Sequence, residues 1–467
     1  MGTAPDLDEP ATRGGDRLVL VAAILGSFVA FLDMSVVNVA LPAIRRSLGG
    51  GTSAQQWIVD AYLLTLSALM LIAGSLSDLL GRRRVFAAGL AGFGAASLLC
   101  AFAPGVTFLI VARALQGAAG ALLVPSSLAL IVSRFKGDAQ GRAIGTWTAW
   151  TGIAFVIGPL LGGALVDAGA HGGSAEAPSM SWRWVFGINV APIVATLLVL
   201  ARLPSDRQRQ RGRSVDGWGA ALCAAGLGGL TFALIEQPRA ATGWAAPSTA
   251  LPLVTGAAAL GAFILRERLA RDPMLDFALF RSRSFAAGNA ATAAIYAGLS
   301  AATFLLALHL QQVVGYRAIA AGAALLPVTL ILFLLSPRFG RWSARRGPRW
   351  FMTAGPIVAG VGLWLLSRMG SHPRYALGVL PGVIVFGLGL ASTVAPLTAA
   401  VLGGVDERHA GVASAVNNAV SRVAGLLAIA AVGARPFQPA LSSMAALLCV
   451  GGLISAAAIR NPGSPPP

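Results

Sequence analysis

The sequence predicts an all-α polytopic membrane protein. Of its 467 residues, 56% are hydrophobic and only 11% are charged, whereas a soluble domain carries roughly 25% charged residues. The hydrophobic residues form long blocks separated by short polar breaks, and this pattern continues to the end of the chain. Because a helix needs about 20 mostly apolar residues to cross a bilayer, these blocks predict membrane spans.

Fourteen segments are long and apolar enough to be spans, and each is expected to be helical because a helix satisfies its own backbone in lipid. In chain order they are Leu18–Ala40, Gln56–Leu76, Val85–Ala103, Val106–Ser133, Ala143–Val166, Val185–Leu203, Trp218–Ile235, Ala250–Leu265, Phe285–Leu308, Ala318–Leu335, Trp350–Leu366, Ala376–Leu402, Gly411–Val432 and Met444–Ile459.

The basic residues predict how these spans are oriented. The chain has 35 Lys and Arg residues and a net charge of +17. With the N-terminus inside, 25 of them fall in cytoplasmic segments, 8 in outer segments and 2 within spans. This excess predicts that both termini are cytoplasmic. It also argues against nucleic acid as a partner, since no soluble domain remains to form a binding face.

A weak internal repeat predicts two related halves. Gly74–Arg84 follows the second span and Gly340–Arg349 follows the tenth, and each has two glycines seven residues apart followed by arginines. Related halves are a transporter architecture. The predicted parts are a tail (residues 1–17), a six-helix bundle (18–203), a linker with two extra spans (204–284), a second six-helix bundle (285–460) and a tail (461–467).

Asp33 interrupts the first span, where an ionised carboxylate costs several kcal/mol and by default marks a functional site. Counted from the predicted span ends at 1.5 Å per residue, Asp33 and Arg113 both lie roughly 10 Å deep and Asp60 about 6 Å deep. These three residues therefore share one outer layer. A carboxylate balanced between burial and a nearby cation can load and release a proton. The alternatives are a permanent Asp33–Arg113 pair that orders the spans, and a direct bond from Asp33 to a cationic substrate.

Several segments resemble signatures of the fourteen-span drug:proton antiporters of the major facilitator superfamily. They occur in the expected order on the expected spans, so that together they are far more specific than any one match. They are Leu32–Pro42, Gly74–Arg84, Arg113–Ala121, Gly158–Gly163, Trp182–Asn189 and Gly411–Arg422.

The resemblance implies a major facilitator fold, with two six-helix bundles and two extra central helices, driven by the proton-motive force. It implies a conformational latch at the cytoplasmic face, formed by Gly74, Asp78, Gly81, Arg82 and Asp138. Leu79 departs from that signature, where the family often has Arg. It also implies an antiporter motif at Gly158, Pro159, Gly162 and Gly163, although Ala154 replaces the early glycine of the full motif.

Four residues are candidates for substrate binding. The resemblance supports Asp60 as a second acidic site, but an acid is also favoured at a helix start by the helix dipole. Asn417, Asn418 and Arg422 lie on the thirteenth span, where they could line a cavity or bond a neighbouring helix. Gln311 lies near an outer boundary, where it could touch substrate or face a loop.

The predicted function is a proton-coupled antiporter that exports small amphipathic compounds, such as drugs or antibiotics, from a bacterial cell by alternating access. An importer or symporter on the same fold is the alternative. A transport-dead sensor is disfavoured because Asp33 and Arg113 are both present. No catalytic motif, cofactor motif or metal-ligand pattern is found, so an enzyme is not expected. The expected partners are the substrate, protons and the lipid bilayer, with the monomer as the functional unit.

Overall fold

The protein is all-helical over the residues that this computed structural model describes. These are residues 10–135, 137–168, 181–202, 216–237, 242–270, 275, 277–371, 373–402, 410–432, 435–459 and 461. The prediction of an all-α chain is therefore confirmed for the described residues.

Eight helical segments precede residue 216, and we call them the first half. They are α1 (Pro10–Leu48), α2 (Thr52–Leu80), α3 (Arg82–Ala101), α4 (Val106–Arg134), α5 (Gly137–Ala168), η2 (Ser181–Arg183), α7 (Trp184–Gly187) and α8 (Val190–Ala201). Residues 10–17 of the predicted tail belong to α1, and Pro10 fits the start of a helix, where no N–H bond is lost.

The remaining helices form a central pair and a second half. The pair is α9 (Gly217–Glu236) and α10 (Pro247–Leu269), with the short η4 (Gly243–Ala245) between them and η5 (Phe277–Arg281) after them. The second half is α11 (Arg283–Gln312), α12 (Ala318–Ala324), α13 (Leu326–Arg346), α14 (Arg349–Ser367), η6 (Tyr375–Val379), α15 (Leu380–Leu402), α16 (Ala410–Val432) and α17 (Phe437–Ala458).

Twelve helical segments are long and apolar enough to cross a membrane, counted over the described part of the chain. All but two of the fourteen predicted spans overlap one of these twelve. The exceptions are the second predicted span, which falls on α2, and the thirteenth, which falls on α16 and contributes only the shorter apolar stretch Val416–Val432. A count of fourteen spans is not established by length and composition.

Prolines account for two breaks within predicted spans. The sixth span is divided between α7 and α8 at Ile188 and Asn189, and the tenth is divided between α12 and α13 at Leu325. Pro192 has no N–H to donate to the carbonyl of Ile188, and Pro327 stands in the first turn of α13. A proline also clashes with the preceding helical turn, so the chain starts a new helix near each of them.

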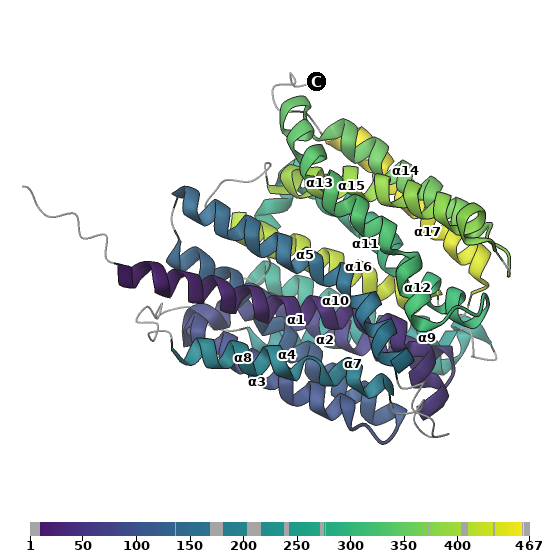
Figure 1. The fold of residues 1–467 in the computed structure, drawn as a ribbon, viewed down its shortest axis with the longest axis horizontal. Coiled ribbons are helices and arrows are strands. Elements are labelled where there is room, and N and C mark those ends of the chain that lie inside the picture. The colour runs from purple at the N-terminus through teal and green to yellow at the C-terminus, as the bar shows by residue number, and fades with distance from the viewer. Residues whose placement is uncertain are drawn as a thin grey trace, which may run out of the picture.

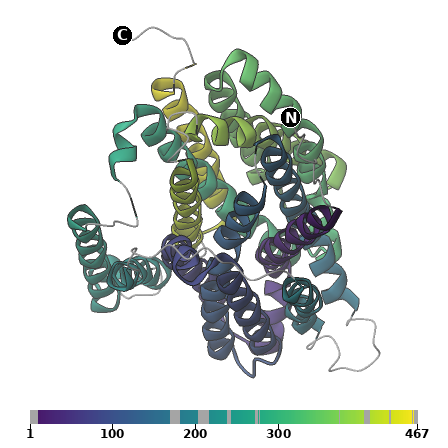
Figure 2. The ribbon, with the colours of Figure 1, turned by 90° about the vertical axis from the view of Figure 1, so that its left-hand side faces the viewer.

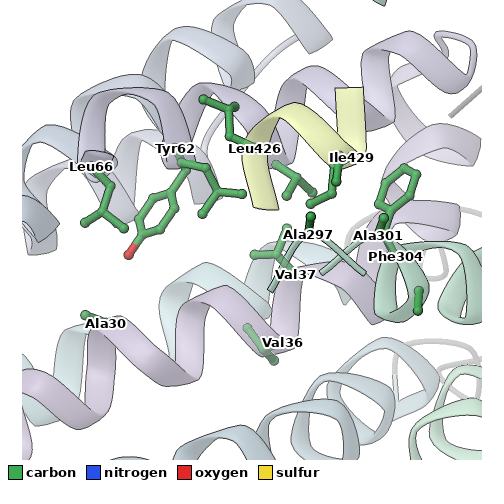
Figure 3. Packing of buried hydrophobic residues seen from close by; sticks show 14 of the residues in the cluster. Ala30, Val36, Val37, Tyr62, Leu66, Ala297, Ala301, Phe304, Leu426 and Ile429 are labelled. Atoms are coloured by element: carbon green, nitrogen blue, oxygen red, sulfur yellow. The ribbon is translucent and has the colours of Figure 1, made fainter. Parts of the chain in front are cut away.

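The two halves pack side by side along their long axes. Figure 1 shows α1–α4, α7 and α8 on one side and α13–α15 and α17 on the other, with α5, α11 and α16 between them. The halves meet where α5 contacts α12, α2 contacts α16 and α1 contacts α11. At this meeting the side chains of Val37, Ala301 and Ile429 belong to one buried apolar cluster (Figure 3).

The central pair lies at one edge of the two halves (Figure 2). Helix α9 packs against α10, and it also contacts α2 of the first half and α16 of the second. The ring of Trp57 on α2 lies 6.1 Å from that of Phe232 on α9. The central pair therefore covers the junction of α2 and α16 on that side.

The internal repeat has a structural counterpart. Gly81 joins α2 to α3 with φ 96°, and Gly347 joins α13 to α14 with φ 85°, a backbone conformation that glycine adopts at little cost. Two residues later, the Arg83 guanidinium donates to the carbonyl of Ala201 at 3.4 Å, and that of Arg349 donates to Ala456 at 2.8 Å. The two turns thus share both backbone geometry and arginine contact.

An ion pair joins the ends of α9 and α10. The carboxylate of Asp216 accepts a hydrogen bond from the Gly219 N–H at 2.8 Å, which caps α9, and lies 2.7 Å from a guanidinium nitrogen of Arg266. The bond from Arg266 is the main cause that lowers the pKa of Asp216. The stabilisation by this carboxylate is therefore present above the usual pKa of aspartate, and it is lost as the pH falls through the lowered pKa.

We expect Asp216→Asn to destabilise the protein by up to about 1 kcal/mol at pH 7, the usual contribution of an ion pair near the surface, because asparagine can still cap α9. Thermal unfolding of the purified protein in detergent measures the difference from wild type. The difference should shrink at a pH below the lowered pKa, where wild-type Asp216 is also neutral. An equal difference at both pH values would contradict the assigned role of the charge.

Candidate functional site

Asp33 lies at the centre of a buried polar network in the first half. Its Oδ2 atom is 2.5 Å from Nη1 of Arg113 on α4, and its Oδ1 atom accepts hydrogen bonds at 2.9 Å from the amides of Gln116 and Asn189. Asp33, Gln116 and Asn189 are fully buried, and Arg113 is 1% exposed. The carboxylate thus has three donors, as an ionised group needs away from water.

Arg113 is held in place by partners on several helices. Its Nε atom donates to the carbonyl of Ile58 on α2 at 3.0 Å, and Nη1 also donates to Oε1 of Gln116 at 2.6 Å. The guanidinium carbon lies 4.3 Å from the centre of the Tyr62 ring, a distance at which cation and ring attract. Hydrogen bonds from other residues therefore hold both members of the Asp33–Arg113 pair in place.

Asn189 is a member of the network that the sequence analysis did not single out. It stands at the break between α7 and α8, and its amide also lies 3.4 Å from Oγ of Ser97, to which Gln116 donates at 2.9 Å. The helix break before Pro192 allows this side chain to reach Asp33. The signal in the sequence was a polar residue inside the sixth predicted span, just as a charged residue inside the first predicted span was the signal for Asp33.

We expect Asn189→Leu to destabilise the protein by about 1–3 kcal/mol, because the buried carboxylate loses one of its donors. A matched control is Asn38→Leu on α1. Because Oδ1 of Asn38 is buried without a partner among the described residues, its removal should cost the protein little stability. Thermal unfolding of both variants in detergent tests the difference. Equal destabilisation would contradict the role given to Asn189.

The first helix does not end near Ala40, the span end from which the depth of Asp33 was counted. It runs on through Pro42 to Leu48, and Gly49 and Gly50 then end it with φ values of 77° and 86°. Asp33 is thus fifteen residues from the helix end, about 22 Å along the axis. The predicted pairing of Asp33 with Arg113 does not depend on this length.

Asp60 is the ninth residue of α2, which begins at Thr52, so the helix-start explanation for this acid fails. The favourable effect of the helix dipole is confined to the first turn. Asp60 is fully buried, and neither of its carboxyl oxygens has a hydrogen-bond partner among the described residues. It lies two residues from Ile58, whose carbonyl binds Arg113.

Two of the polar candidates make contacts between helices. The amide of Asn417 on α16 donates to Asn289 at 3.1 Å and to Thr292 at 2.7 Å, both on α11. The amide of Gln311 donates to the carbonyl of Val39 at 3.1 Å, so it joins the second half to the first. Asn418, by contrast, is exposed.

Several hydrogen bonds between the halves lie at one end of the helices. Besides Gln311 on Val39, Gln56 on α2 donates to the carbonyls of Ile429 and Ala430 on α16, both at 2.9 Å. The Asp167 carboxylate on α5 accepts from the Ile319 N–H at 3.1 Å. These contacts lie near the C-terminal ends of α1, α5, α11 and α16 and close that end of the junction.

The predicted antiporter motif forms the closest approaches of α5 to its neighbours. A Cβ atom added at Gly158 would lie within 2.8 Å of the Ser35 side chain, and one at Gly162 within 2.9 Å of Val36, so both glycines pack α5 on α1. A Cβ at Gly163 would lie 2.4 Å from Cα of Ile319. On the facing helix, Gly322 packs in the same way on the carbonyl of Pro159.

Two of the predicted latch residues can be described in full. Gly81 forms the turn between α2 and α3, and Arg82 donates to the carbonyl of Ala129 on α4 at 3.2 Å. Gly74, Asp78 and Asp138 lie in helices, but their side chains are outside the described set. No group of three or more His, Cys, Asp or Glu residues suited to a metal ion occurs among the described residues.

A pocket lies beside the Asp33 network, between the two halves. Its lining comes mainly from α1 and α2, including Phe31, Met34, Tyr62 and Met70. Arg422 on α16 is the charged residue of the lining and comes from the second half. In Figure 3 the Tyr62 hydroxyl lies in the space between its own helix and the helix of Ala30, which also lines the pocket.

Comparisons with known proteins agree on what this architecture is. The family model described as Major Facilitator Superfamily matches residues 23–429. The multidrug resistance protein Stp of Mycobacterium tuberculosis is 33% identical over 417 residues, which cover 89% of this chain and 75% of that protein. The cephamycin export protein CmcT of Amycolatopsis lactamdurans is 33% identical over 416 residues, 88% of this chain and 83% of the relative.

A solved structure agrees at the level of the fold. The crystal structure of the peptide transporter POT in complex with sulfate has a TM-score of 0.68 and 16% identity, and the match covers 97% of this chain and 95% of that one. A transporter family and a transporter fold confirm that the chain is not an enzyme. The chain belongs to the Major Facilitator Superfamily.

Proposed function

We propose that the protein is a proton-coupled antiporter that exports small amphipathic compounds, such as drugs or antibiotics, across the bacterial cytoplasmic membrane. The similar proteins in Mycobacterium and Amycolatopsis are named for multidrug resistance and for cephamycin export. The observation that carries the coupling is the buried Asp33 carboxylate, which has three donors and lies beside the pocket between the halves.

In this proposal Asp33 carries the proton. With both termini cytoplasmic, the closed end of the junction is the outer one, so the structure corresponds to a transporter that faces inward. An antiporter has delivered its proton to the cytoplasm in that state. Its carboxylate is then ionised and paired, which is the arrangement of Asp33 with Arg113, Gln116 and Asn189. Protonation from outside would weaken these bonds and release the helices that they join.

Asp60 is a second acidic group for the same cycle. An ionised carboxylate that is buried without hydrogen bonds is costly, and both oxygens of Asp60 lack partners among the described residues. We propose that it holds a proton in this conformation and becomes a site for a cation only when α2 moves. The bonds of Asn417 and Gln311 support a role in contacts between helices more than in substrate binding. We propose the same role for Asn418.

The proposal includes fourteen spans, with α2 and α16 added to the twelve that length and composition identify. Helix α2 has 29 residues and α16 has 23, enough to cross about 30 Å at 1.5 Å per residue. The six-helix bundles are residues 18–203 and 285–460, the monomer is the functional unit, and the Gly74–Arg82 turn is the cytoplasmic latch. The contacts of Arg82 and the geometry of Gly81 support the last point.

The test is an efflux assay in inverted membrane vesicles with an imposed pH gradient and a panel of antibiotics and dyes. Export by antiport predicts that some compounds dissipate the gradient only in vesicles that contain the protein. If no compound does so, or if uptake from the outer side drives the proton flux, the proposal is wrong. If an impermeant reagent added outside the cell labels single cysteines placed in the Arg82 loop, the proposed topology is wrong.

A further inference from the structure

Arg422 is a half-buried cation with no acidic partner among the described residues. Its Nη1 atom lies 2.8 Å from the sulfur of Met34, and its guanidinium carbon lies 5.5 Å from the centre of the Phe31 ring. Its Nε atom is buried and has no hydrogen-bond partner within the described part of the chain. A thioether is only a weak acceptor, and arginine does not lose its proton, so this charge is poorly compensated.

The acidic groups nearby do not neutralise Arg422. Asp33 is occupied by Arg113, which it meets at 2.5 Å, and by two amides. Asp60 makes no hydrogen bond to a described residue. Among the described residues, the phenols of Tyr62 and Tyr296 lie close enough to Arg422 to interact with it electrostatically, and a phenol is neutral near pH 7. The pocket therefore has a net positive charge on its second-half side.

The remainder of the lining suits an apolar body. Phe31, Met34, Leu66 and Met70 face the same pocket as Arg422, and methionine side chains adapt to ligands of varied shape. The hydroxyl of Tyr62 also lines it and has no partner among the described residues, so a second donor is available. A molecule with one acidic end and an apolar body is complementary to this lining, because the guanidinium and the hydroxyl can bind the acid while the apolar side chains contact the body.

The pocket is small here, with about 210 Å³ of space between atoms. We infer that, when the halves move apart and widen it, the pocket binds amphipathic organic anions, with the carboxylate on Arg422 and the apolar body against Phe31 and the two methionines. The inference rests on the proposed export function and names the substrate class of that site. A bound carboxylate would supply the charge-assisted bonds that Arg422 lacks. Lipophilic cations, which the acidic residues at first suggest, are disfavoured in this pocket in the present conformation, because Asp33 is already paired.

The test uses three probes that share one aromatic body: 1-naphthaleneacetate, 1-naphthaleneacetamide and 1-naphthaleneethylamine. Binding to the purified full chain in detergent is measured by calorimetry at pH 7. A hydrogen bond to a charged group predicts that wild type binds the acetate at least about 10-fold more tightly than the amide. Arg422→Gln should remove this preference by weakening acetate binding much more than amide binding, and Arg422→Lys should keep part of it. Arg338→Gln is the matched control, because Arg338 is exposed and, among the described residues, donates to the carbonyl of Leu334 on its own helix.

Three results would overturn the inference: no binding of the acetate to wild type, equal binding of the acetate and the amide, or an equal loss for all three probes in Arg422→Gln with Arg422→Lys giving no rescue. Binding needs no gradient, so the test is separate from that of export. If the acetate binds through Arg422 but no compound moves protons, antiport fails and the anion site stands. If compounds move protons without any dependence on Arg422, antiport stands and the anion site fails.

Discussion

Asp33→Asn is expected to abolish proton coupling, with substrate-driven proton flux in proteoliposomes falling by at least about 10-fold. Asparagine keeps the shape of the side chain but cannot exchange a proton near neutral pH. Removing the charge also leaves the Arg113 guanidinium buried beside a neutral group. Breaking one side of a buried ion pair typically costs about 3–5 kcal/mol, so a lower unfolding temperature in detergent should accompany the loss of flux.

A double variant separates the two effects. In Asp33→Asn with Arg113→Gln, no unpaired charge remains, so we expect most of the lost stability to return while the proton flux stays at background. Asp33→Glu, which retains an ionisable carboxyl, should keep measurable coupling. Undiminished flux in Asp33→Asn would show that the proton is carried elsewhere, with Asp60 the next candidate.

Gly163→Val is expected to prevent closure of the outer end and to stop transport. The new side chain would begin 2.4 Å from Cα and 2.6 Å from the backbone nitrogen of Ile319, and backbone atoms at the start of α12 cannot rotate away. Helices α5 and α12 must therefore separate. A cysteine placed at the buried Ala318 position should react with a membrane-impermeant maleimide at least about tenfold faster in this variant, measured on intact cells.

Gly152→Val on the same helix is the matched control, because a Cβ atom at Gly152 meets nothing within 4 Å. It should leave both the labelling rate at position 318 and the transport rate near those of wild type. If Gly163→Val transports normally, the contact between α5 and α12 does not open and close in the cycle. A loss of folded protein in Gly163→Val alone would instead assign the glycine to packing.

Much of the fold follows from length and hydropathy, because lipid leaves the backbone few choices. The two predicted spans between the halves are present as α9 and α10, with ends within four residues of those expected. Helix α1 runs eight residues beyond the predicted span end at Ala40, and Pro42 lies inside it. A proline removes one backbone bond from a helix that tertiary packing can support, and the helix ends instead at Gly49 and Gly50, where φ is positive.

The site was predictable only where a charge appears in an apolar run. Asp33 and Arg113 stand out in this way, and they are in contact. Asn189 and Gln116 bind the same carboxylate, but uncharged amides are cheaper in a span and occur there for many reasons. The role of Arg422 could not be read from spacing, because Asn418, four residues earlier, is exposed while Arg422 meets Met34 from the other half.

The position of α9 restricts how a compound dissolved in the lipid can enter. Since α9 touches both α2 and α16, that flank of the junction is screened from the acyl chains. A molecule that diffuses sideways out of the inner leaflet would have to pass on the opposite flank, along α5 and α13, which are in contact with each other. Helix α9 thus adds a second cover outside the contact of α2 with α16, whereas the opposite flank is closed by the contacts of α5 with α12 and α13 without an outer helix among the described residues.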